Sequence, residues 1–344
     1  MASEPAAPGG AAAAGRGQEE REERVLSFGD VFGRDAGGLI VLLILFGALT
    51  LASDEFLTGD NLANLARQVA IFGIIAVGQL LVILTAGIDL SVGSVLVFSG
   101  VVSAKLMNEV GGNNWGVILI GLAAALASGL AWGLLNGVLI AKAKIPAFIV
   151  TLGTLGMSLG AGYLITGGVD EREVPFKLIA DVGIGRIAGI PYLVLIALAV
   201  AIVLGIILAQ TRFGRYTYAI GSNEEAVRRA GVAVDRHLIK IYALAGTLSG
   251  LAGFMNLARF GTTTIGGHAT DNLNAIAAVV IGGTSLFGGI GSILGTVFGV
   301  FIPAVLQNGF VIVGVQAFWQ QVAVGAVLIL AVYLDQLRRS RRRQ

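Results

Sequence analysis

One carboxylate lies inside the most apolar part of this sequence, and its setting narrows the chemistry that it can perform. Asp89 falls in the stretch LTAGIDLSVGS at 84–94, and the only other charged residue within 69–106 is Lys105. An ionisable group in such a stretch either serves a function or marks a turn of the chain. As a turn residue, Asp89 or Ser91 would cap the following helix by accepting hydrogen bonds from free backbone N–H groups. As a functional residue, Asp89 would contact a solute or a coupling ion. We predict the turn, and the second interpretation stays open.

The sequence contains few of the residues and motifs that enzymes use for catalysis. It has no cysteine, which excludes thiolate chemistry and cysteine-bound metals, and its two histidines, His237 and His268, are too few for a histidine metal cluster. No lysine lies in a G-x-x-x-x-G-K-[ST] phosphate loop, and the H-E-x-x-H and G-x-S-x-G motifs are absent. We therefore predict that the chain is not an enzyme and has no catalytic, cofactor-binding or metal-binding residue. Energy for uphill transport would come from another protein.

The elements that must position Asp89 are those of a membrane protein. Charged residues make up 13% of the chain, about half the usual share, and hydrophobic residues make up 56%. The chain has 51 glycines, and spaced pairs such as Gly246 and Gly250 are expected to let membrane helices approach closely. Because about 20 apolar residues cross the hydrocarbon core, we predict an all-α polytopic membrane protein with about ten transmembrane helices. The predicted spans are 37–53, 69–88, 90–107, 115–140, 145–166, 190–210, 238–260, 272–288, 291–313 and 316–336.

The positions of the charges predict how the chain is threaded. With ten spans and the N-terminus inside, most of the 23 Lys and Arg residues fall in cytoplasmic loops and tails, as the positive-inside rule requires. We therefore expect a multi-pass protein of the cytoplasmic (inner) membrane with both termini in the cytoplasm. In this arrangement, residues 1–36 form a partly disordered cytoplasmic tail, 37–337 the transmembrane domain and 338–344 a basic cytoplasmic tail.

The longest hydrophilic segment between spans, 211–237, is predicted on the cytoplasmic side. Within it, Ser222 and Glu225 have the S-x-x-E spacing of a capping box, which predicts a short helix from Asn223 to about Gly231. A short helix that lies along the membrane surface is suited to docking a cytoplasmic partner.

Small and polar residues flank two predicted interruptions of the apolar spans. One interruption is the Asp89 turn, and the other is GGTSLFGGIGS at 282–292, which predicts a turn or a helix break. Polar groups at these places would either line a path for a hydroxyl-rich solute or form hydrogen bonds between helices. The residues assigned to a helix break or to the pathway are Gly87, Asp89, Ser91, Gly93, Ser94, Asn274, Gly282, Gly283 and Thr284.

Several separated segments closely resemble the permease subunits of bacterial ATP-binding-cassette importers for ribose, xylose, galactose and similar monosaccharides, which are related to branched-chain amino acid permeases. They include TAGIDLSVGS, LNAIAAVVIGGTSLFGGIGSILGT and AIGSNEEAVRRAGVAVDRHLIKIYALAG, and the likeness covers about 55–335. The resemblance implies a second permease copy in a homodimer, separate ATPase subunits, and a periplasmic or lipid-anchored sugar-binding protein. Membrane lipids are the other expected partner, and nucleic acid is not one.

The resemblance also gives the inner helix a role. Permeases of this kind carry a coupling helix, related to E-A-A-x-x-x-G, that docks on the ATPase. The residues assigned to this coupling are Ser222, Glu225, Ala226, Val227 and Gly231, with Val in the third place of the motif. Two positions depart from the family pattern: Asn274 stands where relatives often have Asp, and Ile290 where many have Arg. These departures leave the class of transporter intact and weaken any choice of solute by analogy.

The sequence therefore predicts the translocation subunit of an ATP-driven importer for a monosaccharide such as ribose or xylose. An importer of the same architecture for a nucleoside, a branched-chain amino acid or a signalling furanone is the alternative. An ion-coupled secondary transporter that acts alone is the rival of a different class, and the scarcity of ionisable groups within the predicted spans argues against it.

Overall fold

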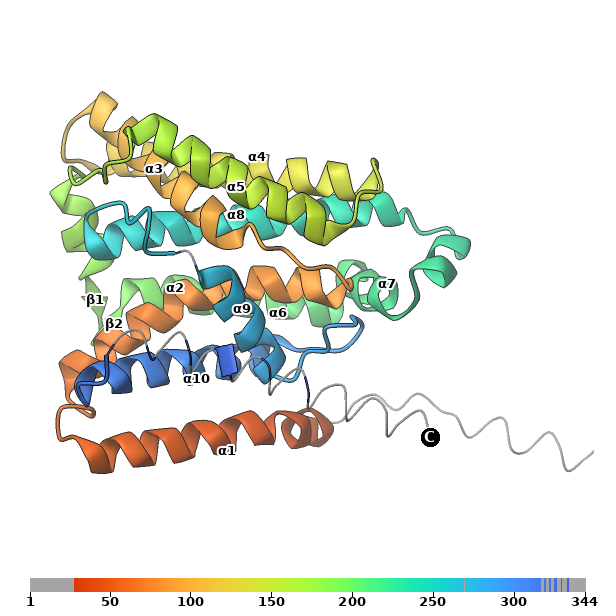
Figure 1. Cartoon of the computed structure of the whole chain (residues 1–344), viewed down its shortest axis with the longest axis horizontal. Helices are drawn as coiled ribbons and strands as arrows, with labels where there is room; N and C mark the ends of the chain where they lie inside the picture. Colours follow the sequence, from red (N-terminus) through yellow and green to blue (C-terminus); the bar gives the residue numbers. More distant parts are fainter. Residues whose placement is uncertain are drawn as a thin grey trace, which may run out of the picture.

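The structure, a computed structural model, describes residues 28–268 and 270–316 together with scattered positions from 319 to 333. Helices form nearly all the regular structure of this part of the chain, which confirms the all-α prediction (Figure 1). A two-stranded hairpin, β1 (Arg186–Ile187) with β2 (Ile190–Pro191), and a π-helix, η1 (Leu178–Gly183), lie between α5 and α6. The α-helices are α1 (Phe28–Ala52), α2 (Gly59–Leu84), α3 (Val92–Val110), α4 (Trp115–Ala141), α5 (Ala147–Thr166), α6 (Tyr192–Gln210), α7 (Arg212–Arg229), α8 (Val234–Phe260), α9 (Asp271–Ile281) and α10 (Ile293–Ile312).

Six of the described helices, α2, α4, α5, α6, α8 and α10, are long and apolar enough to cross a membrane. Two shorter apolar stretches accompany them, Leu39–Ala52 within α1 and the 11-residue α9. The 19-residue α3 is less apolar because Lys105, Asn108 and Glu109 lie near its end. The chain is therefore a polytopic membrane protein.

The helix boundaries differ from the predicted spans where polar residues take part in a helix. α2 begins at Gly59, well before the predicted residue 69, because the Thr58 side chain caps its polar first turn by accepting a hydrogen bond from the N–H of Asn61. In the segment 211–237, α7 is helical from Arg212, where a loop leading to a short helix was predicted. A rule based on hydrophobicity alone leaves out such polar turns.

The predicted span 272–288 is helical only as far as Ile281. Beyond it, residues 282–291 form a loop in which Gly283, Gly288 and Gly289 have positive φ, so the structure has the helix break that the glycines predicted. The predicted span 316–336 falls largely outside the described residues, as do most of the tail 1–36 and all of the tail 338–344.

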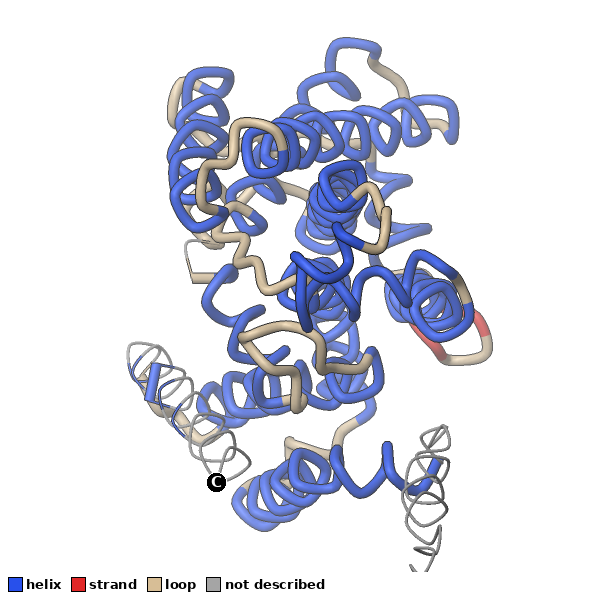
Figure 2. The backbone as a smooth tube through the Cα atoms, turned by 90° about the vertical axis from the view of Figure 1, so that its right-hand side faces the viewer, coloured by secondary structure: helices blue, strands red, loops and turns tan. Residues whose placement is uncertain are grey.

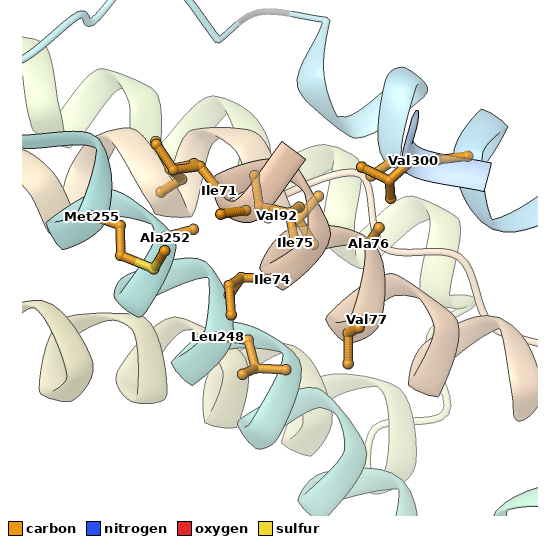
Figure 3. Packing of buried hydrophobic residues seen from close by; sticks show 14 of the residues in the cluster. Ile71, Ile74, Ile75, Ala76, Val77, Val92, Leu248, Ala252, Met255 and Val300 are labelled. Atoms are coloured by element: carbon orange, nitrogen blue, oxygen red, sulfur yellow. The ribbon is translucent and has the colours of Figure 1, made fainter. Parts of the chain in front are cut away.

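α2 and α8 form the centre of the bundle. Within their most apolar windows, 78% of the residues of α2 and 67% of those of α8 are buried inside the protein, whereas the figure for α6 is 17%. Figure 3 shows the contact between the two central helices, where Ile71 and Ile74 of α2 face Leu248 and Met255 of α8. The apolar surface of α6 is left for lipid or for another protein to cover.

Glycines bring α4 and α8 together at backbone distance. A Cβ atom on Gly129 would overlap the carbonyl oxygen of Gly246, and one on Gly133 would overlap that of Tyr242. In turn, Gly250 lies against the backbone of Ala125. This contact confirms the packing role predicted for Gly246 and Gly250, because only residues without a side chain permit so close an approach.

The long helices run roughly side by side, so loops gather at two ends of the molecule (Figures 1 and 2). The β1–β2 hairpin lies at one end, and α7 lies at the other with the turn after α2 and the loop before α10. The two predicted helix breaks are thus connected to the end of the bundle that carries α7.

Candidate functional site

Asp89 occupies the non-helical stretch between α2 and α3, which confirms the predicted turn. Its side chain is buried, with 2% exposed, and its Oδ1 atom accepts hydrogen bonds from the backbone N–H (2.8 Å) and the hydroxyl (2.6 Å) of Ser91. α3 starts at Val92, and Ser91 is its N-cap without a side-chain capping bond. The carboxylate therefore holds the N-cap residue itself in an Asx turn and does not cap the first helical turn, so the capping prediction is wrong in that detail.

Ser91 connects this carboxylate to two other helices. Its hydroxyl donates to Asp89 and accepts a hydrogen bond from Nδ2 of Asn136 in α4 (2.9 Å). The Oδ1 atom of Asn136 in turn accepts from the Thr154 hydroxyl of α5 (2.8 Å). We call these four residues, Asp89, Ser91, Asn136 and Thr154, the Asp89 network. Each is at most 2% exposed, so the network ties three helices together inside the bundle.

Neighbouring polar groups extend this contact between helices. Ser158 of α5 donates to the hydroxyl of Ser94 in α3 (2.8 Å). Gly87 lies beside the Tyr242 hydroxyl, because a Cβ there would be 2.5 Å from the Tyr242 oxygen. That hydroxyl is buried and has no hydrogen-bond partner among the described residues. Small residues at 87 and 94 thus let polar groups of other helices reach the Asp89 turn.

The start of α9 also contacts the Asp89 turn. Asn272 donates from Nδ2 to the carbonyl of Leu90 (3.2 Å), and a Cβ on Gly93 would lie 2.9 Å from the carbonyl oxygen of His268. Asn274 lies in this helix and is buried, with 5% exposed. The structure therefore brings Leu90 and Gly93 against the start of the helix that carries Asn274.

A contact between His268 and the buried Asp271 at the start of α9 was not predicted from the sequence. His268 Nδ1 lies 2.6 Å from Asp271 Oδ2, and His268 Nε2 lies 2.8 Å from the Thr264 hydroxyl. Asp271 is 5% exposed. The sequence did not mark Asp271 as unusual, because this residue lies just before the predicted span 272–288, where carboxylates are common. The i, i+3 spacing of His268 and Asp271 was the available signal.

Gly282, Gly283 and Thr284 lie at the other end of α9, where the loop before α10 begins. A Cβ on Gly282 would overlap the carbonyl oxygen of Gly295 in α10, and Gly283 has φ +88°. Thr284 is buried, and its hydroxyl has no partner among the described residues. The nine residues assigned to breaks or pathway thus form two clusters, one at each end of α9.

α7 consists of two helical pieces joined by a kink at Asn223, whose φ of −161° and ψ of 93° are not helical. The Asn223 side chain accepts a hydrogen bond from the N–H of Ala226 (3.0 Å) and so caps the second piece. Ser222 instead donates its hydroxyl to the carbonyl of Tyr218, and Glu225 pairs with Arg229. The predicted capping box is therefore wrong, because the asparagine one residue later performs the capping.

The second piece of α7, residues 224–229, is called the coupling segment below. It ends as predicted, with Gly231 at φ +83° and the N–H of Val232 donating to the carbonyl of Val227. Val227 is half-buried and Ala226 is exposed, like the charged residues of the segment. This short helix is thus presented on the surface of the protein.

Ion pairs fix the coupling segment to the rest of this end of the bundle. Arg228 Nη2 lies 2.8 Å from both Glu224 and Asp235, and Lys144 Nζ lies 2.8 Å from the same Asp235. Hydrogen bonds to Asp235 and Glu224 raise the pKa of Arg228 further above its usual value. Of the residues assigned to coupling, Glu225, Ala226 and Val227 lie within this segment and Gly231 lies two residues after it. Among the described residues, no group of three or more His, Asp or Glu is arranged to hold a metal ion.

Residues 61–332 match the protein family described as the permease component of the branched-chain amino acid transport system. The chain is 41% identical to the ribose import permease protein RbsC of Escherichia coli over 302 residues, which cover 86% of this chain and 92% of that protein. It is 37% identical over 306 residues to the fructose import permease protein FrcC of Rhizobium meliloti, covering 87% and 83% of the two chains. It is 35% identical over 311 residues to the L-arabinose ABC transporter permease protein AraH of Azospirillum brasilense, covering 90% and 89%. No solved structure gives a significant match.

Proposed function

The chain belongs to the family of permease components of the branched-chain amino acid transport system, and from this premise we propose that it is the translocation subunit of an ATP-binding-cassette importer for a monosaccharide. Membership of this family makes the chain a transport protein of the membrane and not an enzyme. The observation that carries the choice of solute is the similarity to permeases named for ribose, fructose and L-arabinose, which extends over at least 83% of each of the chains compared.

The partners follow from this proposal. An importer of this type needs a separate ATPase, and the coupling segment is the docking element that we propose for it. The segment is exposed and short, and an ion pair joins it to α8. It can therefore transmit a displacement from a bound protein to the helix bundle. A sugar-binding protein would deliver the solute at the opposite end, near the β1–β2 hairpin. A second copy of the permease would complete the translocation path.

We propose further that both termini lie in the cytoplasm. The distribution of Lys and Arg supports this orientation, because Lys142, Lys144, Arg212, Arg215 and the arginines of the coupling segment all belong to the end of the bundle that carries α7. The coupling segment would then face the cytoplasm, where ATP is available.

Two other functions have an observation in their favour. The description of the family favours a branched-chain amino acid as solute. The contact between His268 and the buried Asp271 is of a kind that an ion-coupled transporter would use, so transport without ATP is tested directly. Both alternatives can be separated from the proposal in one experiment.

The test is ATP hydrolysis by the complete complex of permease, ATPase and binding protein, reconstituted in lipid vesicles. The solutes would be D-ribose, D-xylose, L-arabinose and D-fructose, with L-leucine and adenosine as the comparison. We expect at least one sugar to stimulate hydrolysis and to enter only when ATP is supplied. Stimulation by leucine or adenosine alone would reassign the solute. Uptake driven by an imposed ion gradient, without ATP or ATPase, would overturn the proposal.

A further inference from the structure

Three segments that are far apart in sequence meet directly beside the kink of α7. They are the end of α2 with the first residues of the following turn (84–86), Gly221 and Ser222 of α7, and the loop 282–291 before α10. The N–H of Gly289 donates to the carbonyl of Leu84 (3.0 Å), which joins the loop to α2. Figure 1 shows the three segments together at the end of the bundle that carries α7. We call this contact the glycine junction.

The glycine junction is a contact of backbone against backbone. A Cβ on Gly221 would overlap the carbonyl oxygen of Leu84 and lie 2.5 Å from the nitrogen of Gly289. A Cβ on Gly288 would lie 2.8 Å from the nitrogen of Ala86 and 2.9 Å from the Cα of Gly221. Gly288 and Gly289 also have φ of +81° and +74°, which other residues adopt reluctantly. Apart from the Ala86 methyl group beside Gly288 and the Ser222 hydroxyl beside Gly289, the segments meet through backbone atoms. Changes of side-chain rotamer can therefore absorb little of a displacement between them.

Tyr218 makes a second connection, one helical turn before Gly221. Its hydroxyl donates to the carbonyl of Gly291 (3.0 Å), at the end of the loop that leads into α10. Burial raises the pKa of the Tyr218 phenol, so the hydroxyl retains the proton that it donates at neutral pH. The loop is also closed on itself by the bond from the N–H of Ser285 to the carbonyl of Ile290 (2.9 Å). α7 therefore holds a preformed loop at two points.

We propose that Tyr218, Gly221 and Gly289 are positioning residues that transmit movement of the coupling segment to both helix breaks at once. Packed backbone contacts of this kind move as a unit between discrete arrangements and do not deform continuously. The turn at 85–91 leads into the Asp89 network and α3, and the loop leads into α9 and α10. A displacement of α7 thus reaches the polar interior by two routes. This inference rests on the proposed function, because it assumes that an ATPase displaces the coupling segment.

The experiment compares three variants in the reconstituted complex. Gly221→Ala adds one methyl group where the Leu84 carbonyl lies, and Tyr218→Phe removes only the bond to Gly291. Gly160→Ala is the matched control, because it adds the same methyl group to a helical glycine that has no atom within 4 Å of that position. For each variant, the measurements are retention of the ATPase during purification, basal ATP hydrolysis, and the stimulation of hydrolysis by the loaded binding protein. The loading sugar is the one that stimulates the wild-type complex most.

We expect Gly221→Ala to retain the ATPase and its basal hydrolysis. The sugar-dependent stimulation of hydrolysis should fall at least tenfold. Tyr218→Phe should lower the stimulation roughly two- to tenfold, as expected for one neutral hydrogen bond. Gly160→Ala should behave as wild type. If Gly221→Ala does not accumulate in the membrane, the stimulation measured for Tyr218→Phe is the test of the proposal.

Two results would overturn the positioning role. One is normal stimulation in both Gly221→Ala and Tyr218→Phe. The other is loss of the ATPase itself from both variants, which would make the junction part of the docking surface. Absence of any stimulation in the wild-type complex is a different result, since it rejects the proposed function before the variants are compared.

Discussion

Asp89 shows how one residue can join three helices without lying within any helix. Its carboxylate accepts two hydrogen bonds from Ser91. Ser91 accepts one from Asn136, and Asn136 accepts one from Thr154. In the low dielectric of a membrane interior, each of these bonds is strong and each unpaired group is costly. The sequence indicated that the chain turns at Asp89, but the partners lie 45 and 63 residues beyond Ser91 and had no local signal.

The first prediction concerns replacement of this carboxylate. Asp89→Asn keeps a carbonyl oxygen that can accept from Ser91, whereas Asp89→Ala leaves the buried N–H of Ser91 without its acceptor. We expect Asp89→Ala to destabilise the protein by about 1–3 kcal/mol and Asp89→Asn to cost less. Thermal unfolding in detergent measures the difference. If both variants unfold like the wild type and yet neither transports, Asp89 contacts the solute or a coupling ion, and the structural interpretation is wrong.

At the scale of elements, the predicted helices agreed with the structure where an apolar run decided them and disagreed where polar residues did. α5, α6 and α8 lie close to the predicted spans 145–166, 190–210 and 238–260 because each contains an apolar run long enough to cross the hydrocarbon core. α2 and α7 start earlier because Thr58 and Thr211 cap polar first turns. The shift of the cap from Ser222 to Asn223 has the same cause: several residue types can cap, and tertiary contacts select one.

The packing of the candidate site was much less predictable than its residues. The sequence identified Asp89, Ser91 and the glycines of the two breaks, because their types are unusual within apolar spans. It gave no indication that the loop 282–291 would touch both α2 and α7, since that contact depends on how the helices pack. Nor did it reveal that Asp271 is buried, because burial there depends on His268 and on contact with α3.

The second prediction tests the end of the coupling segment. Gly231→Val places a β-branched residue at φ +83°, at a cost of about 1–2 kcal/mol, and should distort the surface offered to the ATPase. Gly167→Val is the matched control, because Gly167 also ends a helix at positive φ (+64°) with open space around it, on α5 at the opposite end of the bundle. We expect Gly231→Val to reduce sugar uptake and ATPase retention severalfold, with the amount of protein in the membrane nearly unchanged. Co-purification and labelled-sugar uptake measure both effects. Normal values for Gly231→Val would show that this segment does not couple to the ATPase.

The third prediction concerns the contact between α4 and α8. Gly129→Ala inserts a methyl group where the carbonyl of Gly246 lies, and overpacking of this kind costs about 1–3 kcal/mol. Gly156→Ala in α5 adds the same group with no atom within 4 Å and should leave stability unchanged or slightly improved. The melting temperatures of the two variants in detergent are the comparison. Equal values would mean that the two helices do not approach as closely as described.

At the scale of the whole molecule, we propose that one chain is an incomplete transporter. α5 and α6 bury only 28% and 17% of the residues in their most apolar windows. Lipid can cover such surfaces, but a path for a hydroxyl-rich solute needs polar walls on all sides. We therefore expect a second permease to supply the remaining walls.

The fourth prediction follows for the assembled complex. Native mass spectrometry of the purified importer should find two permease chains of 35.3 kDa each for every two ATPase subunits. Crosslinking in the membrane before extraction controls for dissociation in detergent. An active complex that contains a single permease chain would contradict the expected pair.

The helices differ in length, and this has a consequence for the bilayer itself. At 1.5 Å per residue, the 19 residues of α6 extend about 28 Å, close to the hydrocarbon thickness of about 30 Å. The 27 residues of α4 and of α8 extend about 40 Å. In a thicker membrane the long helices can reduce their tilt, whereas α6 is already no longer than the hydrocarbon core. Lipids with longer acyl chains must therefore thin locally around α6 and around α5 and α10, which have 20 residues each. The annulus beside these short helices sets the thickness that the protein tolerates.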